Sequence, residues 1–135
     1  MKLLLDTHIL LWSLLKPEEL SSSMVAALED EKNDIWLSPI STWEIMLLIE
    51  RGRVEVKGDD PGKWIKNVLS SLPIKEAPLT HEVAIQSRMI KLPHQDPADR
   101  FIMASALVYE LTLMTIDQKL IESEYKKHLF LSKIS

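Results

Sequence analysis

The amino-acid sequence predicts an α/β fold: a three-layer α/β/α domain with a short, mostly parallel central sheet. Short apolar runs alternate with longer segments of helical pattern along the chain, and this alternation is typical of parallel strands joined by helices. The strand-like runs, such as Leu3–Leu5, are apolar at successive positions, which favours strands covered on both faces. The length of 135 residues suits one domain spanning positions 1–135.

The first half of the chain is predicted to contain two strands and four helices. The short apolar runs Leu3–Leu5 and Ile35–Leu37 predict the strands. Gly52 marks the end of one helix, and the Gly/Asp/Pro segment 57–63 is predicted to be a loop within the domain. The helices are predicted at Ile9–Leu15, Ser23–Glu31, Ile40–Arg51 and 61–72.

The second half continues the alternation on both sides of a loop at 91–97. Three further strands are predicted at Ile74–Ala77, Leu113–Ile116 and Leu129–Leu131. Three further helices are predicted at Glu82–Ile90, Ala98–Glu110 and Lys119–Tyr125.

Composition and charge exclude several classes of protein. The 20 Asp and Glu outnumber the 16 Lys and Arg, and a net charge of −4 provides no global basic field, so a polyanion must bind locally. The absence of Cys excludes disulfides, thiolate metal sites and a Cys nucleophile. Asp6 and His8 interrupt the apolar start, and no small-residue cleavage site follows. We therefore expect no signal peptide, no membrane span and a cytoplasmic location.

Four acidic residues occupy comparable positions around the predicted sheet. Asp6 and Asp117 each follow an apolar strand directly, whereas Glu44 and Asp99 lie early in helices that follow strands. The carboxyl ends of parallel strands and the starts of the following helices meet at one edge. Helix capping is the alternative for each acid, because Asp is a common N-cap and Ser41 to Glu44 matches a capping box.

Carboxylates gathered at one edge repel each other, and a divalent cation would neutralise them. An all-oxygen site with neither Cys nor a paired-His motif favours Mg²⁺ or Mn²⁺ over Zn²⁺. One or two ions are expected. Thr115 lies two residues before Asp117, where its hydroxyl is expected to orient a ligand, unless it is an ordinary strand residue.

Four motifs resemble those of PIN-domain ribonucleases, and in particular VapC-type toxins of bacterial toxin–antitoxin pairs. They are Leu3 to His8, Ile40 to Ile45, His94 to Ala104 and Thr115 to Asp117, and the resemblance extends from residue 2 to about 131. It implies a PIN-like fold and a metal-dependent endoribonuclease with Asp6, Glu44, Asp99 and Asp117 as metal ligands. Asp96 either joins them or caps the following helix.

The resemblance also implies RNA as the substrate, in-line attack that leaves a 5′-phosphate and a 3′-hydroxyl, and a small antitoxin whose peptide covers the acidic pocket. Apolar residues in excess of one helix face suggest an antitoxin contact or a homodimer; they include Leu11, Leu14, Leu15, Met46, Leu47 and Leu48. Two other interpretations remain: a PIN-like scaffold without catalysis, and phosphoryl transfer through an aspartyl-phosphate at Asp6. The second lacks an acid at position 8, which is His.

Several further residues are candidates for contact with RNA. Arg100 is expected to pair with a substrate phosphate or a neighbouring carboxylate, and His8 and His94 are weaker candidates for proton transfer or phosphate contact. A basic group, interleaved with acids, consists of Arg51, Arg53, Lys57, Lys63 and Lys66. Core packing is expected for Trp12, Trp36 and Trp43 rather than base stacking, whereas Trp64 is open to either role.

Overall fold

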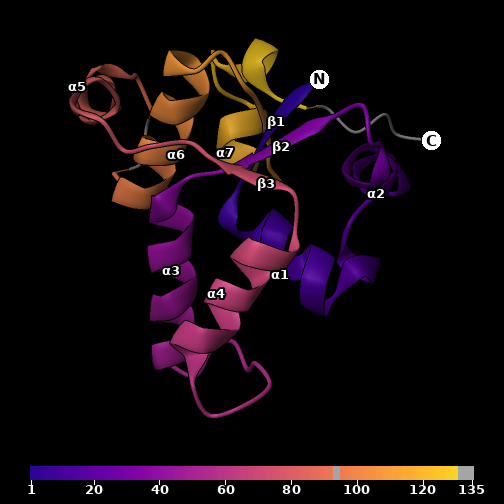
Figure 1. Cartoon of the computed structure of the whole chain (residues 1–135). Helices are drawn as coiled ribbons and strands as arrows, with labels where there is room; N and C mark the ends of the chain where they lie inside the picture. Colours follow the sequence, from indigo (N-terminus) through magenta and orange to yellow (C-terminus); the bar gives the residue numbers. More distant parts are fainter. Residues whose placement is uncertain (93–94, 131–135) are drawn as a thin grey trace.

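Four parallel strands form the centre of the structure. The computed structural model describes residues 1–92 and 95–130, and within them the strands form one sheet in the order β3-β2-β1-β4 (Figure 1). The pairings Leu3↔Ile35, Leu3↔Thr112 and Ile35↔Ile74 are all parallel. The strands are β1 (Lys2–Leu5), β2 (Asp34–Leu37), β3 (Ile74–Glu76) and β4 (Thr112–Met114).

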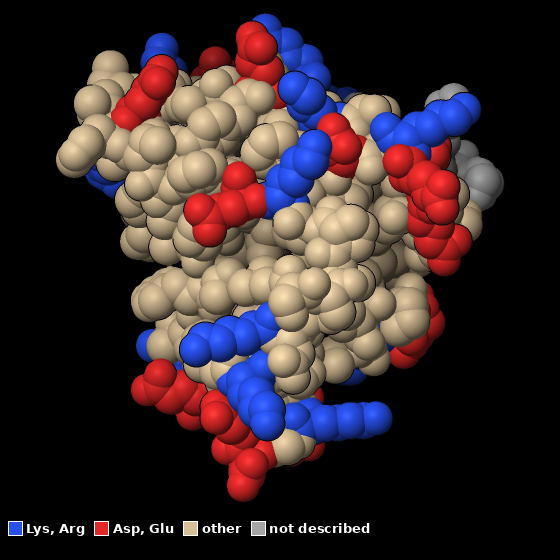
Figure 2. Space-filling model, viewed as in Figure 1, with Lys and Arg blue, Asp and Glu red and all other residues tan. Residues whose placement is uncertain are grey.

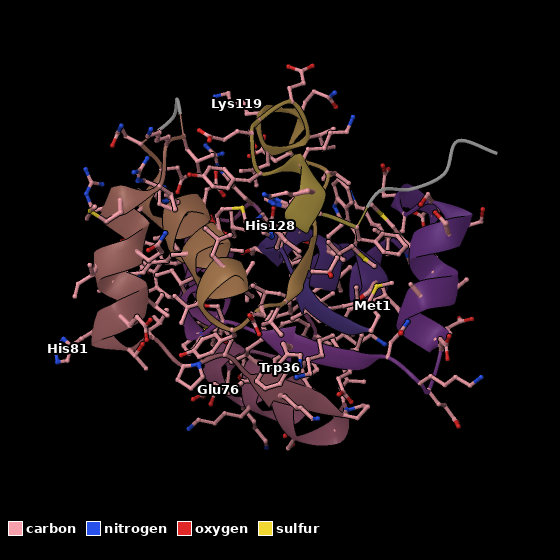
Figure 3. All side chains as sticks on the ribbon, turned by 90° about the horizontal axis from the view of Figure 1, so that it is seen from above. Met1, Trp36, Glu76, His81, Lys119 and His128 are labelled. Carbon is pink, nitrogen blue, oxygen red and sulfur yellow. The ribbon has the colours of Figure 1, made fainter. Side chains whose placement is uncertain are left out.

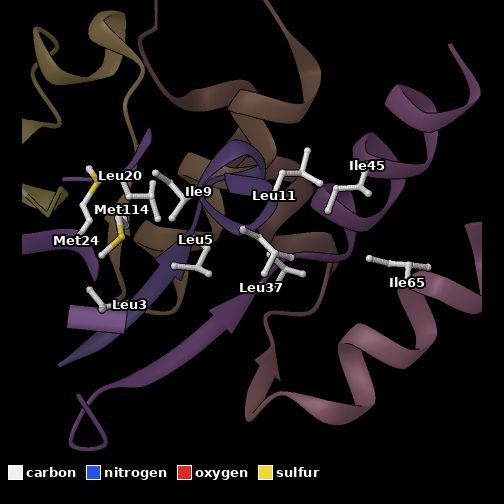
Figure 4. Packing of buried hydrophobic residues seen from close by; sticks show 11 residues of the cluster. Leu3, Leu5, Ile9, Leu11, Leu20, Met24, Leu37, Ile45, Ile65 and Met114 are labelled. Atoms are coloured by element: carbon white, nitrogen blue, oxygen red, sulfur yellow. The ribbon is translucent and has the colours of Figure 1, made fainter. Parts of the chain in front are cut away.

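Alternate residues of β1 point into two different hydrophobic cores. Leu3 and Leu5 pack with the helices between residues 7 and 71 on one face of the sheet, as Figure 4 shows for Leu3, Leu5, Ile9 and their neighbours. Leu4 packs with the helices at 97–108 and 118–121 on the other face. All three leucines are at most 2% exposed, so the sheet is covered on both sides and the predicted three-layer α/β/α fold is confirmed.

The helices of the first layer are closely matched by the prediction. Each begins after an N-cap residue, either Asp or Ser, whose side chain accepts a backbone N–H bond. The helices are α1 (Thr7–Leu15), α2 (Ser22–Glu29), α3 (Pro39–Glu50) and α4 (Pro61–Ser71), with a short 3₁₀ turn at Pro17–Glu19.

The second layer lies against the opposite face of the sheet. It contains α5 (His81–Met89), α6 (Pro97–Val108) and α7 (Gln118–Ile121), followed by a 3₁₀ turn at Lys126–His128. Figure 3 shows the two edges of the sheet from above: Glu76 marks the β3 edge, and Lys119 and His128 lie beside the β4 edge. In the part of the chain that the structure describes, no helix is long and apolar enough to cross a membrane.

The C-terminal elements differ from the prediction. The helix expected over Lys119–Tyr125 ends at Ile121, because Ser123 bonds the local backbone: its hydroxyl donates to Leu120 O and accepts from Tyr125 N. The strand expected over Leu129–Leu131 is a single parallel bridge between Leu129 and Leu113. Position 131 lies outside the described residues.

Two expectations about apolar side chains also need correction. Trp43 does not pack in the core, since it lies on the outer side of α3 and is 56% exposed. The leucines in excess of one helix face are mostly packed within the chain, and Leu11 is only 2% exposed. Leu15 is the member of that group that stays largely exposed, at 41%.

Candidate functional site

Three of the predicted acids begin helices at the same edge of the sheet. Asp6 follows β1 and accepts a hydrogen bond from Thr7 N at 2.8 Å. Asp117 caps α7 through Lys119 N at 3.0 Å, and Asp96 caps α6 through Ala98 N at 3.0 Å. The capping interpretation is therefore confirmed for these three. It does not exclude metal binding, because each cap bond involves one of the two carboxylate oxygens.

Thr115 connects two of these acids. Its hydroxyl donates to Asp6 Oδ2 at 2.6 Å and accepts a hydrogen bond from Asp117 N at 3.0 Å. Thr115 and Asp6 are both buried, so the bond fixes the Asp6 carboxylate where water cannot replace the hydroxyl. A hydrogen bond from Thr115 to one of the predicted ligands, Asp6, is therefore present.

Glu44 is positioned by a second hydroxyl pair. The predicted capping box is wrong, because α3 begins three residues earlier with Ser38 as its N-cap and Pro39 in its first turn. Thr7 Oγ1 instead donates to Ser41 Oγ at 3.1 Å, and both residues are fully buried. Thr7 also lies close enough to Glu44 to lower the pKa of its carboxyl group, against the larger effect of burial, which raises it. From the sequence, Thr7 and Ser41 are predicted only as helix caps. The position of Thr7 directly after Asp6 is the one sequence signal that places it near the acidic edge.

Asp99 lies at the electrostatic centre of the acidic group. Burial raises the pKa of Asp99 to about 7, with further contributions from the negative charges of Asp6, Asp96, Asp117 and Glu44. Side-chain burial also raises the pKa of Asp6, against hydrogen bonds from Thr115 and Thr7 that lower it. Burial likewise raises the pKa of Glu44, against the lowering effect of Thr7. Asp6, Glu44, Asp96 and Asp117 therefore all lie close enough to Asp99 to affect its ionisation.

The donor set of this edge fits Mg²⁺ or Mn²⁺ in its chemistry, since it consists of carboxylate and hydroxyl oxygens. Among residues 1–92 and 95–130, however, no group of three or more His, Cys, Asp or Glu side chains is arranged to hold a metal ion as it stands. A cation at this edge would have to draw carboxylates such as Asp99 together. It would also relieve the repulsion that, beside burial, raises the pKa of Asp99.

The side chain of Arg100 is buried and bound to backbone carbonyls. Its side chain is 4% exposed and donates to the backbone carbonyls of Ser87 and Ile90 at 2.9 and 2.8 Å. The expected phosphate contact is therefore wrong, because a buried guanidinium that holds carbonyl groups cannot also reach a substrate in solvent. His8 is exposed and packs edge-on against Trp12, with ring centroids 5.9 Å apart. His94 lies outside the described residues.

The basic group of the sequence lies at the far end of α3 and α4. Figure 2 shows blue and red side chains mixed at the lower end of the molecule, where Figure 1 places the loop between these helices. Asp59 and Asp60 are exposed beside Lys57 and Lys63. Trp64 is half-buried against the first core. This region therefore presents no continuous basic surface.

Comparisons with known proteins agree with this architecture. The chain is 28% identical over 120 residues to Ribonuclease VapC22 of Mycobacterium tuberculosis (strain ATCC 25618 / H37Rv), which covers 87% of this chain and 88% of that protein. Its fold is similar to a chain of VapBC2 from Rickettsia felis, crystallised with a DNA fragment from their promoter (TM-score 0.63, 20% identity, 98% of each chain). It is also similar to a chain of a toxin-antitoxin complex from Klebsiella pneumoniae (TM-score 0.62, 20% identity, 95% of each chain).

The sequence also matches the family model of the PIN domain over residues 3–124. This match extends from β1, past the acidic edge, to the turn after α7. Since it covers most of the chain and includes Asp6, Glu44, Asp99 and Asp117, this protein belongs to the PIN domain family.

Proposed function

We propose that this PIN domain protein is a Mg²⁺- or Mn²⁺-dependent endoribonuclease and the toxin of a type II toxin–antitoxin pair, working in the cytoplasm. The observation that carries the proposal is the acidic edge, where burial and the negative charges of four neighbouring carboxylates raise the pKa of Asp99. A fold gains nothing from such repulsion unless a cation relieves it. The similarity to a ribonuclease named VapC22 supports RNA as the substrate.

Asp6, Glu44, Asp99 and Asp117 would hold one or two ions, with Asp96 as a further donor. When bound, the metal supplies a more acidic water and a positive charge that stabilises the leaving oxygen. Thr115 keeps Asp6 in one orientation through its 2.6 Å bond, and Thr7 lies beside Glu44 and favours its ionised form. Asp99 would have to be deprotonated to serve as a ligand. The proposed products carry a 5′-phosphate and a 3′-hydroxyl.

We also propose a small antitoxin as a partner and a homodimer as the assembly. The antitoxin is supported by the solved complexes to which this fold is similar. An apolar groove of about 530 Å³ between α1 and α4, lined in part by Leu14, Leu15 and Trp64, offers a place for the partner's side chains. For the homodimer, Ile85 and Met89 of α5 are 65% and 68% exposed.

The test is cleavage of total RNA with and without Mg²⁺ or Mn²⁺, beside the Asp6→Asn protein. Cleavage should require the added ion, and Asp6→Asn should lower it at least ~100-fold, because both ligand charge and geometry change. Glu29→Gln is the matched control, since Glu29 is an exposed acid of α2, and it should cleave as the wild type does.

Each outcome tests a different part of the proposal. Undiminished cleavage in excess EDTA would contradict the metal requirement, and full activity in Asp6→Asn would remove Asp6 from the site. Wild-type protein that cuts no RNA with either ion would favour the PIN-like scaffold without catalysis.

A further inference from the structure

Arg100 lies at the junction of α5 and α6 and binds the end of α5. Among the described residues, its guanidinium donates to the backbone carbonyls of Ser87 at 2.9 Å, Ile90 at 2.8 Å and Leu92 at 3.5 Å. The last carbonyls of a helix have no partner within the helix and carry its negative dipole end. A buried cation is therefore well placed to hold the end of α5 and the residues after it.

Arg100 also contacts the start of α6, on the other side of the connection between the two helices. Arg100 N donates to Asp96 O at 3.2 Å, and Asp96 accepts from Ala98 N through its side chain. The backbone of Arg100 thus fixes the start of α6 while its side chain fixes the segment that ends at Leu92. Tyr125 provides a third contact, because its hydroxyl accepts a hydrogen bond from Lys91 N at 2.8 Å.

These contacts converge on two acids of the site. Asp96 caps α6 and Asp99 directly precedes Arg100, so both depend on where the start of α6 lies relative to α5. Figure 1 shows α5 and α6 side by side at one end of the molecule. Lys cannot replace Arg here, because the planar guanidinium presents several donors in a fixed fork whereas an ammonium is a single point charge.

We propose that Arg100 is a positioning residue: by clamping the end of α5 to the start of α6, it fixes the backbone of Asp96 and Asp99 at the acidic edge, from which their carboxylates would bind the metal. The metal part of this inference rests on the proposed function. Arg100 itself touches neither metal nor RNA. A purely structural role would lower the stability of the whole protein and leave the metal affinity of the folded protein unchanged.

The first experiment measures amide hydrogen exchange in EDTA for the wild type, Arg100→Lys and Ile65→Ala. Ile65 is the matched control because it is buried in α4, within the core on the other face of the sheet. The amides of Lys91 and Ala98 should exchange at least ~10-fold faster in Arg100→Lys than in Ile65→Ala at matched global stability, because only the first opens this connection locally. Equal exchange in the two variants would overturn the clamp.

The second experiment follows the melting temperature of the same proteins during a Mn²⁺ titration. The half-saturating concentration should rise at least ~10-fold in Arg100→Lys and stay unchanged in Ile65→Ala, because disturbing what orients a ligand weakens metal binding. An unchanged value in Arg100→Lys would overturn the positioning role. A wild type without any Mn²⁺ response would contradict the proposed function instead, and the exchange rates would still test the clamp.

Tyr125→Phe keeps the inference testable if Arg100→Lys does not fold. It removes only the hydroxyl that accepts Lys91 N and leaves the buried guanidinium in place. We expect a smaller effect in the same direction, about 2- to 3-fold in half-saturating Mn²⁺, together with faster exchange at Lys91. Wild-type values in both measurements would show that this connection does not control the acids.

Discussion

Replacing Asp99 by Asn should make the metal-free protein more stable above neutral pH. The carboxyl of Asp99 has its pKa raised to about 7 by burial and by the neighbouring acids. Ionised Asp99 is therefore unfavourable in the folded state, whereas the unfolded chain ionises it freely near pH 4. The penalty is absent below about pH 4, grows as the pH rises, and is complete above about pH 7. Asn carries no charge, so the Asp99→Asn protein does not have this penalty.

The size of the gain follows from the two pKa values. A rise from 3.8 to about 7 corresponds to roughly 4 kcal/mol, because each pKa unit is worth about 1.4 kcal/mol. Water around this half-buried side chain screens part of it, and losing a negative charge in the first turn of α6 costs about 0.3–1 kcal/mol. A net gain on the order of 2 kcal/mol remains, which is about 8 °C in melting temperature for a protein of this size.

Thermal melts at about pH 8 and pH 4, in EDTA and in ~10 mM Mg²⁺, test this reasoning. In EDTA, Asp99→Asn should melt higher than the wild type at pH 8 and within error of it at pH 4. Mg²⁺ at 100 times its Kd should stabilise the wild type by about 2.7 kcal/mol. That gain should shrink or vanish in Asp99→Asn, so the order of the two proteins should reverse at pH 8. A variant that melts lower in EDTA and keeps the full Mg²⁺ response would refute Asp99 as a ligand.

Two further predictions concern Thr115 and Leu15. Thr115→Val removes the 2.6 Å bond to Asp6 and the acceptor for Asp117 N, so RNA cleavage should fall about 10- to 100-fold. Thr115→Ser keeps the hydroxyl and should restore most of the activity. Equal cleavage rates in the wild type and both variants would show that Asp6 does not need the Thr115 bond. Leu15→Glu should weaken capture of the proposed antitoxin from an extract of the native host, since Leu15 lines the α1–α4 groove. Leu79→Glu, at a similarly exposed position outside the groove, should leave this capture unchanged. Equal capture by the two variants would show that the groove is not the binding site of the partner.

Much of this architecture could be predicted because local pattern and topology agree. The apolar run Leu3–Leu5 predicts β1 to within one residue, since a strand buried on both faces leaves no room for a polar position. A parallel sheet sends the ends of its strands to one edge. Asp6 and Asp117, which directly follow predicted strands, could therefore be placed near each other from sequence alone.

Arg100 and Trp43 show what the sequence could not reveal. The burial of Arg100 depends on carbonyls from Ser87 to Leu92, which return past it only once α5 has packed against α6. Trp43 lies in a helix that is apolar around most of its circumference, so periodicity does not identify the face that packs. Tertiary contacts decide both cases, and neither leaves a local signal.

The position of β1 in the sheet has a consequence for synthesis on the ribosome. β1 is the first strand to emerge, yet it pairs on one side with β4, and Leu5 lies opposite Met114. The bond between Thr115 and Asp6 joins residues 109 positions apart. Closing so long a loop is slow and entropically costly. During synthesis Asp6 therefore lacks the support of Thr115 until residue 115 has been made, and the acidic edge assembles only after that point.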